Sequence, residues 1–475
     1  MWTVQILMID KLKKAKRKWI AGGVVIYVVY AVAGVTGGVY LSSVPSVSEV
    51  PQPVSTDERV ALVETGEEAW QIRRELITEA DTTLDIATFA MQGGETVDLF
   101  YSLILEAADR GVQVRLLLDG IFHGMRLLDR QIYDVFLSHP NIEVGMYDTL
   151  NPLRPWTWNN RMHDKLLIAD EKVGLIGGRN VGDKYFNESA DTVSYDRELL
   201  VIGQDGSANE LVSDMSHYFD ELWSMPYVTR RQDPVPTLTS NWRVRRTSET
   251  LRERAARYHE GSLTPMTEEY WMKKSHAIDS GYFVHNGLER LNKEPAVWHS
   301  LLTVLSETEE SILIQSPYVI PDAFMSETAG MHAIKSDTVT ILTNGLQSTP
   351  NIIAHSGYRN HRDELIESGL NLLEFQKPDR SLHMKSFVKD NEWVGVGSFN
   401  IDARSTYLHT ESMLVVSSPS LAEEINRMNE ERYGSHIYPA QSEDPLPEGA
   451  DGTHMLKQLI IDTLRPLTDL FDSLL

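Results

Sequence analysis

The sequence predicts an α/β fold of two similar α-β-α sandwich halves, related by a pseudo-two-fold axis and preceded by one N-terminal transmembrane helix. The main observation is a pattern that occurs twice. Its positions are His163, Lys165, Asp170, Gly177 and Asn180 and, 220 residues later, His383, Lys385, Asp390, Gly397 and Asn400. Five matched positions in one register indicate an internal duplication. Strand and helix patterns around each copy, and an uncharged N-terminal stretch, complete the prediction.

Both copies of the pattern have the composition of a strand, a turn and a second strand. Residues 162–169 and 173–176 flank the first turn, and residues 382–389 and 393–396 flank the second. Apolar and β-branched residues bounded by Asp and Asn are typical of strands that end in turns. The duplicated unit is therefore expected to present its histidine and lysine from a strand.

Side chains alternate along a strand, so His163 and Lys165 share one face, as do His383 and Lys385. Asp170 and Asp390 have the opposite parity and lie at the turns. We therefore interpret these two aspartates, which belong to the catalytic motif, as residues that hold the turn rather than as groups that contact substrate.

The strands outside the motif repeat more faintly. Residues 84–89 parallel 312–318, residues 112–118 parallel 338–342, and residues 97–110 have a helical pattern. Strands that alternate with helices predict a largely parallel sheet in each half, covered on both faces.

These patterns divide the chain into seven segments. They are a basic tail (1–18), a transmembrane helix (19–41), a linker (42–60), a first half (61–235), an inter-half segment (236–290), a second half (291–440) and a C-terminal tail with an amphipathic helix (441–475). A chain of 475 residues is long enough for two core-forming halves.

The two motifs together suit chemistry on a phosphodiester. Lys165 and Lys385 would repel each other at close quarters unless an anion lay between them. Their charge also favours neutral histidine, the nucleophilic form. One histidine could attack phosphorus while the other donates a proton to the leaving alcohol. No metal or cofactor is expected to take part.

Other residues are candidates to support these groups. The amides of Asn180 and Asn400 and the hydroxyl of Ser398 can donate to phosphate oxygens, and Gly178 allows close approach of the backbone. Each histidine also needs a partner that fixes its tautomer. Three acids are candidates: Glu411, 28 residues after His383; Glu198, at the similar place after His163; and Asp196 as an alternative.

The motifs resemble the two H-x-K-x4-D motifs of the phospholipase D superfamily, and the chain is most similar to its bacterial cardiolipin synthases. The stretches that carry the resemblance are 161–165, 177–186, 397–405, 107–112 and 139–144, within residues 60 to 440. The chain departs from the usual pattern at Gly178, in place of a serine, and at Ala403, in place of a frequent proline. Phe89 and Met91 stand where an aromatic cluster is often found.

The resemblance implies a metal-independent, ping-pong phosphatidyl transfer through a phosphohistidine. His163 would be the nucleophile and His383 the acid and base. Phosphatidylglycerol would supply the phosphatidyl group, and a second phospholipid would accept it to form cardiolipin. The expected substrates are phosphatidylglycerol and, as a second candidate, phosphatidylethanolamine. A hydrolase acting on a lipid, or less favourably on nucleic acid, is the alternative. Both H-x-K pairs are intact, which argues against an inactive lipid-binding protein.

The N-terminus predicts a single-pass anchor in a bacterial cell membrane. Residues 11–18 contain six basic side chains, and residues 19–41 form an uncharged run long enough to span a bilayer. The positive-inside rule then places the catalytic region on the extracytoplasmic side. Met8 is an alternative start, and Gly34 and Gly38 form a weak helix-pairing pattern.

Charge and composition limit the classes of molecule that the protein is expected to bind. The net charge of −24 disfavours binding to nucleic acid, and the absence of cysteine excludes disulfides and thiolate chemistry.

Six arginines between 243 and 257 would face either lipid headgroups or Glu249 and Glu253. Apolar residues recur at helical spacing after Leu456, and this stripe would pack on the enzyme or lie at a membrane surface, the former being favoured. Pro466 is expected to break or kink that helix.

Overall fold

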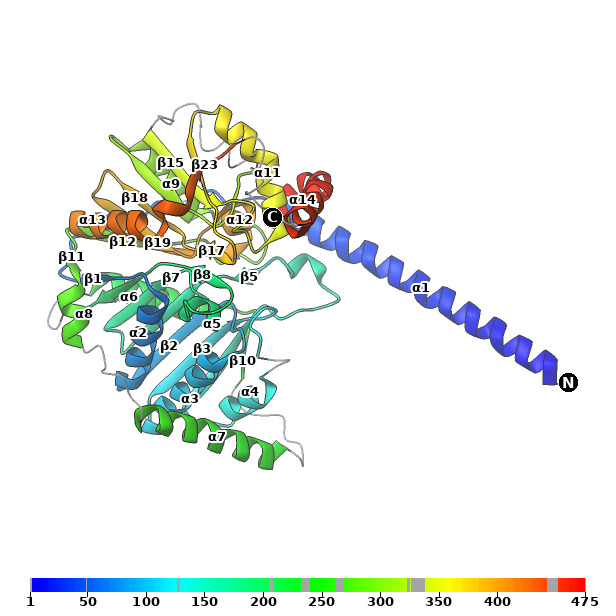
Figure 1. Cartoon of the computed structure of the whole chain (residues 1–475). Helices are drawn as coiled ribbons and strands as arrows, with labels where there is room; N and C mark the ends of the chain where they lie inside the picture. The colour runs from blue at the N-terminus through cyan, green and yellow to red at the C-terminus, as the bar shows by residue number, and fades with distance from the viewer. Residues whose placement is uncertain are drawn as a thin grey trace.

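The computed structural model describes residues 2–47, 49–125, 129–204, 209–231, 240–260, 268–322, 325, 338–441 and 452–474. Two large mixed sheets, of nine and eight strands, form the centres of two halves that stack on each other, and a long helix projects from one side (Figure 1). The predicted fold class of two α-β-α halves is confirmed.

The two sheets share one strand order, which shows the duplication directly. The first sheet runs β10 (Val228–Arg231), β4 (Ile142–Tyr147), β3 (Gln113–Asp119), β2 (Thr83–Thr88), β6 (Lys165–Ala169), β7 (Val173–Gly177), β9 (Glu198–Ile202), β1 (Arg59–Val63), β11 (His276–Ala277). In the matching direction, the second runs β23 (Ile437–Pro439), β16 (Asn371–Phe375), β15 (Val339–Asn344), β13 (Ile312–Gln315), β18 (Ser386–Lys389), β19 (Trp393–Gly397), β22 (Ser412–Ser417), β12 (Ser280–His285). The order β3-β2-β6-β7-β9 thus corresponds to β15-β13-β18-β19-β22.

The expectation of largely parallel sheets is wrong. Within the two large sheets, among the residues that the structure describes, the parallel pairs are confined to β2, β3 and β4 in the first half and β13, β15 and β16 in the second. The motif strands β6–β7 and β18–β19 pair antiparallel. The reason is local, because strands joined by a three-residue turn can only run in opposite directions, whereas parallel neighbours need a long crossover.

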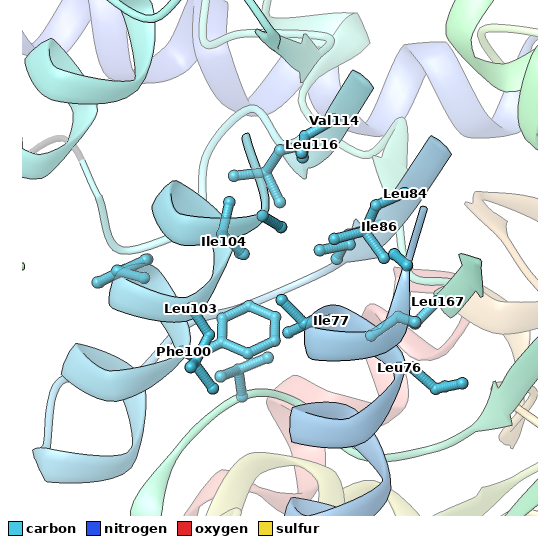
Figure 2. Packing of buried hydrophobic residues seen from close by; sticks show 14 of the residues in the cluster. Leu76, Ile77, Leu84, Ile86, Phe100, Leu103, Ile104, Val114, Leu116 and Leu167 are labelled. Carbon is cyan, nitrogen blue, oxygen red and sulfur yellow. The ribbon is translucent and has the colours of Figure 1, made fainter. Parts of the chain in front are cut away.

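Helices cover the outer face of each sheet. In the first half these are α2 (Gly66–Glu79), α3 (Glu95–Arg110) and α4 (Arg130–Leu137), and in the second α9 (Ala296–Ser306) and α11 (Ile352–Glu367). Figure 2 shows Ile77 of α2 and Phe100 of α3 packed against Ile86 of β2. Each such fully buried side chain contributes roughly 1.5–3 kcal/mol.

The inner faces of the two sheets share one core. Leu211 and Phe219 of α6 (Glu210–Ser224) and Ile425 of α13 (Pro419–Met428) lie in the same apolar cluster as Leu199 of the first sheet and Val394 of the second. Because this core joins the halves, the ends of β6 and β18, which carry the motifs, are held at a fixed separation.

The segment between the halves contributes to both of them. It contains α7 (Ser240–Glu260), α8 (Glu268–Lys274), β11 and β12, while residues 232–239, including the proposed boundary at 235, lie outside the described part. Arg252 pairs with Asp109 at 2.7 Å and Arg254 with Asp98 at 2.9 Å, both acids of α3. These two arginines therefore hold α7 on the first half.

The N-terminal helix α1 (Trp2–Tyr40) projects away from the two halves (Figure 1). Over Lys16–Tyr40 it is long and apolar enough to cross a membrane by length and composition, with a mean hydropathy of 1.9 and none of its most apolar window buried. It is the one such helix in the described part of the chain.

The C-terminal helix α14 (Gly452–Leu470) lies on α11 beside the C-terminal end of α1 (Figure 1). Pro466 lies inside α14 and does not end it, so of the two expected effects, a break or a kink, the break does not occur. The favoured expectation for its apolar stripe is also wrong. Ile461 and Thr468 face α11, whereas Leu459, Leu467 and most of the other apolar side chains are exposed.

Candidate active site

The two catalytic-motif histidines are held by short strands that pair across the halves. β5 (Arg161–Met162) pairs in parallel with β21 (His409–Thr410), and β17 (Arg380–Leu382) pairs with β8 (Val193–Tyr195). His163 N donates to Thr410 O at 3.2 Å, and His383 N donates to Tyr195 O at 2.6 Å. The expected continuous strands, 162–169 and 382–389, are therefore interrupted at the histidines, whose backbone is fixed by the opposite half.

Each imidazole has a carboxylate from the other half at its Nδ1. Glu411 Oε1 lies 2.9 Å from His163 Nδ1, and Asp196 Oδ2 lies 2.6 Å from His383 Nδ1. Both carboxylates are completely buried. Each histidine thus has a carboxylate from the other half, rather than the acid that follows it in its own half. Asp196, the alternative candidate, contacts a histidine, whereas Glu198 was the acid expected to do so.

Glu198 does not contact either histidine. Its carboxylate binds Arg73 at 2.5 and 2.8 Å and Arg179 at 3.2 Å. In a continuous strand, residues two apart would share one face. Asp196 instead lies in the break between β8 and β9, where the chain leaves strand conformation, so the two acids reach different groups. Glu198 is a buried ion-pair residue of the first half.

The two lysines lie beside the histidines of their own motifs. The Nζ of Lys165 donates to the carbonyl oxygen of His163, and that of Lys385 donates to the carbonyl oxygen of His383. Burial lowers the pKa of Lys165 to about 7 and that of Lys385 to about 8, against the opposing effect of nearby carboxylates. A bound anion would therefore stabilise the charged forms of both lysines.

The same surroundings act on the histidines and on Glu411. Burial first, and then Lys165 and Lys385, hold the pKa of both His163 and His383 well below the usual value. Burial raises the pKa of Glu411 to about 7. Neutral imidazoles whose Nδ1 atoms face carboxylates leave the Nε2 atoms free to react.

The predicted phosphate-binding residues lie around this pair. Asn180 Nδ2 donates to the Tyr185 hydroxyl at 3.1 Å, and Asn400 Nδ2 lies 3.3 Å from Ser405 Oγ. Ser398 differs from the expectation, because its hydroxyl donates to Glu411 Oε2 at 2.5 Å rather than being free for phosphate.

Gly178 corresponds to Ser398 in the first half. A Cβ at Gly178 would lie 2.4 Å from Asp196 Oδ1. The shorter aspartate therefore brings its carboxylate close to the main chain, into space that a serine side chain would need. The pair Glu411 and Ser398 in the second half and the pair Asp196 and Gly178 in the first half therefore occupy equivalent space beside their histidines.

Asp170 and Asp390 lie at the turns, as interpreted from their parity. Asp170 accepts from the backbone N–H groups of Asp81, Thr82 and Thr83 at 2.7–2.9 Å. Asp390 accepts from those of Glu309, Glu310 and Ser311 at 2.7–3.1 Å. Both residues have positive φ, and neither contacts a histidine. Each ties the motif hairpin to the chain that enters the neighbouring parallel strand.

Sequence reasoning missed His409. Its ring lies 5.5 Å from that of His163, it is buried, and neither ring nitrogen has a hydrogen-bond partner among the residues that the structure describes. β21 pairs with β5 in one half-to-half contact, and β8 pairs with β17 in the other, so Ser194 is the counterpart of His409 in the first half. The ligand atoms of His163, His409 and Glu411 lie within 4.8 Å of one another, a spacing that could hold a metal ion. No sequence motif identifies His409, because it lies beside His163 only through the pairing of β21 with β5.

Comparison with known proteins identifies the family. The family model described as "Cardiolipin synthase, PLD-like domain" matches residues 74–223 and 301–432. The chain belongs to this family. Each matched segment contains one H-x-K motif, in agreement with the duplicated sheet order. The chain is thus an enzyme of the phospholipase D superfamily, of the phosphatidyltransferase class.

Individual relatives agree with this assignment. Cardiolipin synthase C of Escherichia coli is 31% identical over 417 residues, covering 77% of this chain and 82% of that protein. A cardiolipin synthase of Halalkalibacterium halodurans is 25% identical over 364 residues, covering 76% and 63%. The crystal structure of phosphatidylserine synthase from Haemophilus influenzae matches 90% of this chain and 98% of its own with a TM-score of 0.62 at 14% identity, which shows a shared fold.

Proposed function

We propose that this protein makes cardiolipin by transferring a phosphatidyl group from phosphatidylglycerol to a hydroxyl of a second phospholipid, through a covalent phosphohistidine. The observation that carries this proposal is the pair of buried imidazoles, His163 and His383, each with a carboxylate at Nδ1 and a lysine beside it. The names of the relatives support the lipid substrate.

In the first half-reaction, His163 Nε2 attacks phosphorus and forms an N–P bond. The bond between phosphorus and the glycerol headgroup oxygen breaks. His383, whose protonated form the bound phosphodiester anion favours, gives its Nε2 proton to that oxygen and becomes neutral, so that glycerol leaves. Glu411 accepts the Nδ1–H of His163 and stabilises the positive charge that develops on this ring. Lys165 and Lys385 stabilise the negative charge on the phosphoryl oxygens.

In the second half-reaction, a hydroxyl of the acceptor lipid gives its proton to His383 Nε2 while its oxygen attacks phosphorus. The N–P bond breaks and His163 returns to its neutral form. Two phosphatidylglycerol molecules thus yield one cardiolipin and one glycerol, and no proton is gained or lost overall. Phosphatidylethanolamine carries no headgroup hydroxyl, so as a second substrate it would act as the donor, with ethanolamine as the leaving group.

We further propose that α1 anchors the enzyme in the bacterial cell membrane as a single span, with the catalytic halves on the extracytoplasmic side. The basic residues that precede the apolar run support this orientation, since such clusters stay in the cytoplasm. The division into a tail, span, linker, two halves, inter-half segment and C-terminal helix belongs to the same proposal.

The experiment is a lipid-product assay. The full-length protein is incubated with phosphatidylglycerol in mixed micelles, with and without phosphatidylethanolamine, and the products are identified by mass spectrometry. Cardiolipin formed by the wild type and by His217→Ala, an exposed histidine of α6, but not by His163→Ala, is the expected result. Phosphatidic acid as the sole product would instead show a hydrolase.

A further inference from the structure

The outward face of α14 is apolar although the helix is already docked. The side facing α11 makes polar contacts: Ser356 Oγ donates to Ile461 O at 2.9 Å, and Arg465 Nε donates to Asn360 Oδ1 at 3.0 Å. The exposed apolar side chains are Met455, Leu456, Leu459, Ile460, Leu467 and Leu470. At 3.6 residues per turn they fall in an arc of about 140° opposite Ile461, and no charged residue of α14 lies in that arc.

A second apolar element lies beside α1. Residues 149–158, here called the α1 loop, leave the first sheet after β4 and return to β5. Leu150, Leu153 and Trp156 of this loop are exposed, Leu153 to 75%. Large apolar residues gathered on two neighbouring surface elements are typical of an interaction site rather than of an ordinary solvated surface.

The α1 loop fits closely against the apolar part of α1. Tyr27 Oη donates to Pro152 O at 3.1 Å, and Tyr30 Oη donates to Leu153 O at 2.7 Å. A Cβ on Gly34 would lie 2.5 Å from Pro155 Cγ, and one on Gly38 would lie 2.9 Å from Trp156 O. The glycine pattern thus admits this loop, where the sequence suggested a second helix.

The position of these contacts along α1 indicates that the α1 loop lies in the hydrocarbon core of a bilayer. Tyr27, the deeper of the two contacts, is fourteen residues before Leu41, so the loop reaches about 21 Å along α1 from the end of the apolar run. That is about two-thirds of a hydrocarbon core of roughly 30 Å. In hydrocarbon, irregular backbone needs partners for its carbonyls, and the two tyrosine hydroxyls supply them for Pro152 and Leu153.

We propose that the α1 loop and the outward face of α14 insert into the same bilayer as α1, and together form one membrane-embedded surface. In Figure 1, α1 runs across the view while α14 is seen close to end-on, so a bilayer crossed by α1 has α14 lying along its surface. Net charge favours lipid tails over headgroups as the contact, because the body of the protein is acidic and the arc is uncharged.

The consequence is direct access for lipid. The α1 loop continues into β5 and then into His163, and the last turn after α14, η5 (Asp472–Leu474), contacts both α1 and α12 (Ala403–Tyr407). Both inserted elements thus border the His163 side of the site. A phospholipid would reach this histidine from the leaflet next to the catalytic halves without crossing water.

This inference rests on the proposed anchoring, so the experiment tests the two separately. The chain has no cysteine, so single cysteines can be placed at Leu153, Leu459 and Leu467, with Val28 in α1 as the anchoring control and Glu249 on α7 as the solvent control. Each full-length variant is labelled with an environment-sensitive fluorophore in nanodiscs of phosphatidylcholine with brominated acyl chains. Only variants that keep cardiolipin synthesis are compared.

Quenching at Val28, Leu153, Leu459 and Leu467, each at least twofold above Glu249, is the expected result. Quenching at Val28 with none at the other three would overturn this proposal and leave the anchor intact. No quenching at Val28 would overturn the anchor. Labels at Leu459 and Leu467 that are shielded from both bromine and an aqueous quencher would show that protein, a partner or a second copy, covers α14.

Discussion

Glu411 Oε1 lies 2.9 Å from His163 Nδ1, although the two residues are 248 positions apart and belong to different halves. The equivalent contact joins Asp196 and His383 in the opposite direction. Each half therefore completes the catalytic group of the other, and neither half alone holds an oriented histidine. This exchange makes the duplicated fold necessary for the proposed chemistry, rather than only a source of two similar sites.

The first prediction concerns these carboxylates. Glu411→Gln keeps the shape of the side chain but removes the negative charge that stabilises a positive His163 ring, so kcat should fall by about 10²- to 10⁴-fold, as for other histidine–carboxylate pairs. The matched control is Glu198→Gln, which disturbs the ion pairs with Arg73 and Arg179 and should lower thermal stability instead. Equal losses of kcat in the two folded variants would contradict the assignment.

The second prediction concerns Gly178. Gly178→Ala places a methyl group 2.4 Å from the buried Asp196 carboxylate, which must move away from His383. We expect at least a tenfold loss of kcat in a protein that still folds. Gly93→Ala, where nothing lies within 4 Å of the new Cβ, is the control and should behave as the wild type. Normal turnover by Gly178→Ala would show that the position of Asp196 is not critical.

The third prediction separates the turn aspartates from the histidines. Asp390→Ala removes the acceptor of three backbone N–H groups and places alanine at a φ of 51°. The free energy of unfolding should fall by about 1–3 kcal/mol, measured by chemical denaturation. Asp363→Ala, an exposed residue of α11, should change it by less than about 0.5 kcal/mol. A folded Asp390→Ala that lacks activity would give the aspartate a chemical role.

The fourth prediction is a pH dependence of anion binding. The pKa of Lys165 is lowered to about 7 and that of Lys385 to about 8, so both lose protons in the free enzyme at alkaline pH. An anion favours the charged forms, and its binding is therefore accompanied by proton uptake. The Kd of sulfate, a dianion throughout, should tighten by roughly tenfold from pH 9 to pH 7. Calorimetry that found a constant Kd would contradict these lysine pKa values.

The sequence alone predicted the features that depend on residues close together in the chain. The strand–turn–strand motifs, the turn role of Asp170 and Asp390, and the duplicated halves follow from residue types at fixed spacing. The exchange of Glu411 and Asp196 could not be predicted, because it depends on which short strands meet between the halves. The exposed stripe of α14 was misjudged for a similar reason, since periodicity identifies an apolar face but not the surface that it meets.

The measurement that tests the central claim most directly is identification of the histidine that carries the phosphatidyl group. His383→Ala is mixed with phosphatidylglycerol, quenched in alkaline denaturant, digested and analysed by mass spectrometry. His383→Ala lacks the proton donor and acceptor, so it should form the intermediate slowly and accumulate it. We expect the adduct on the peptide that contains His163, and none in His163→Ala. An adduct on His383 in the His163→Ala variant would reverse the two roles.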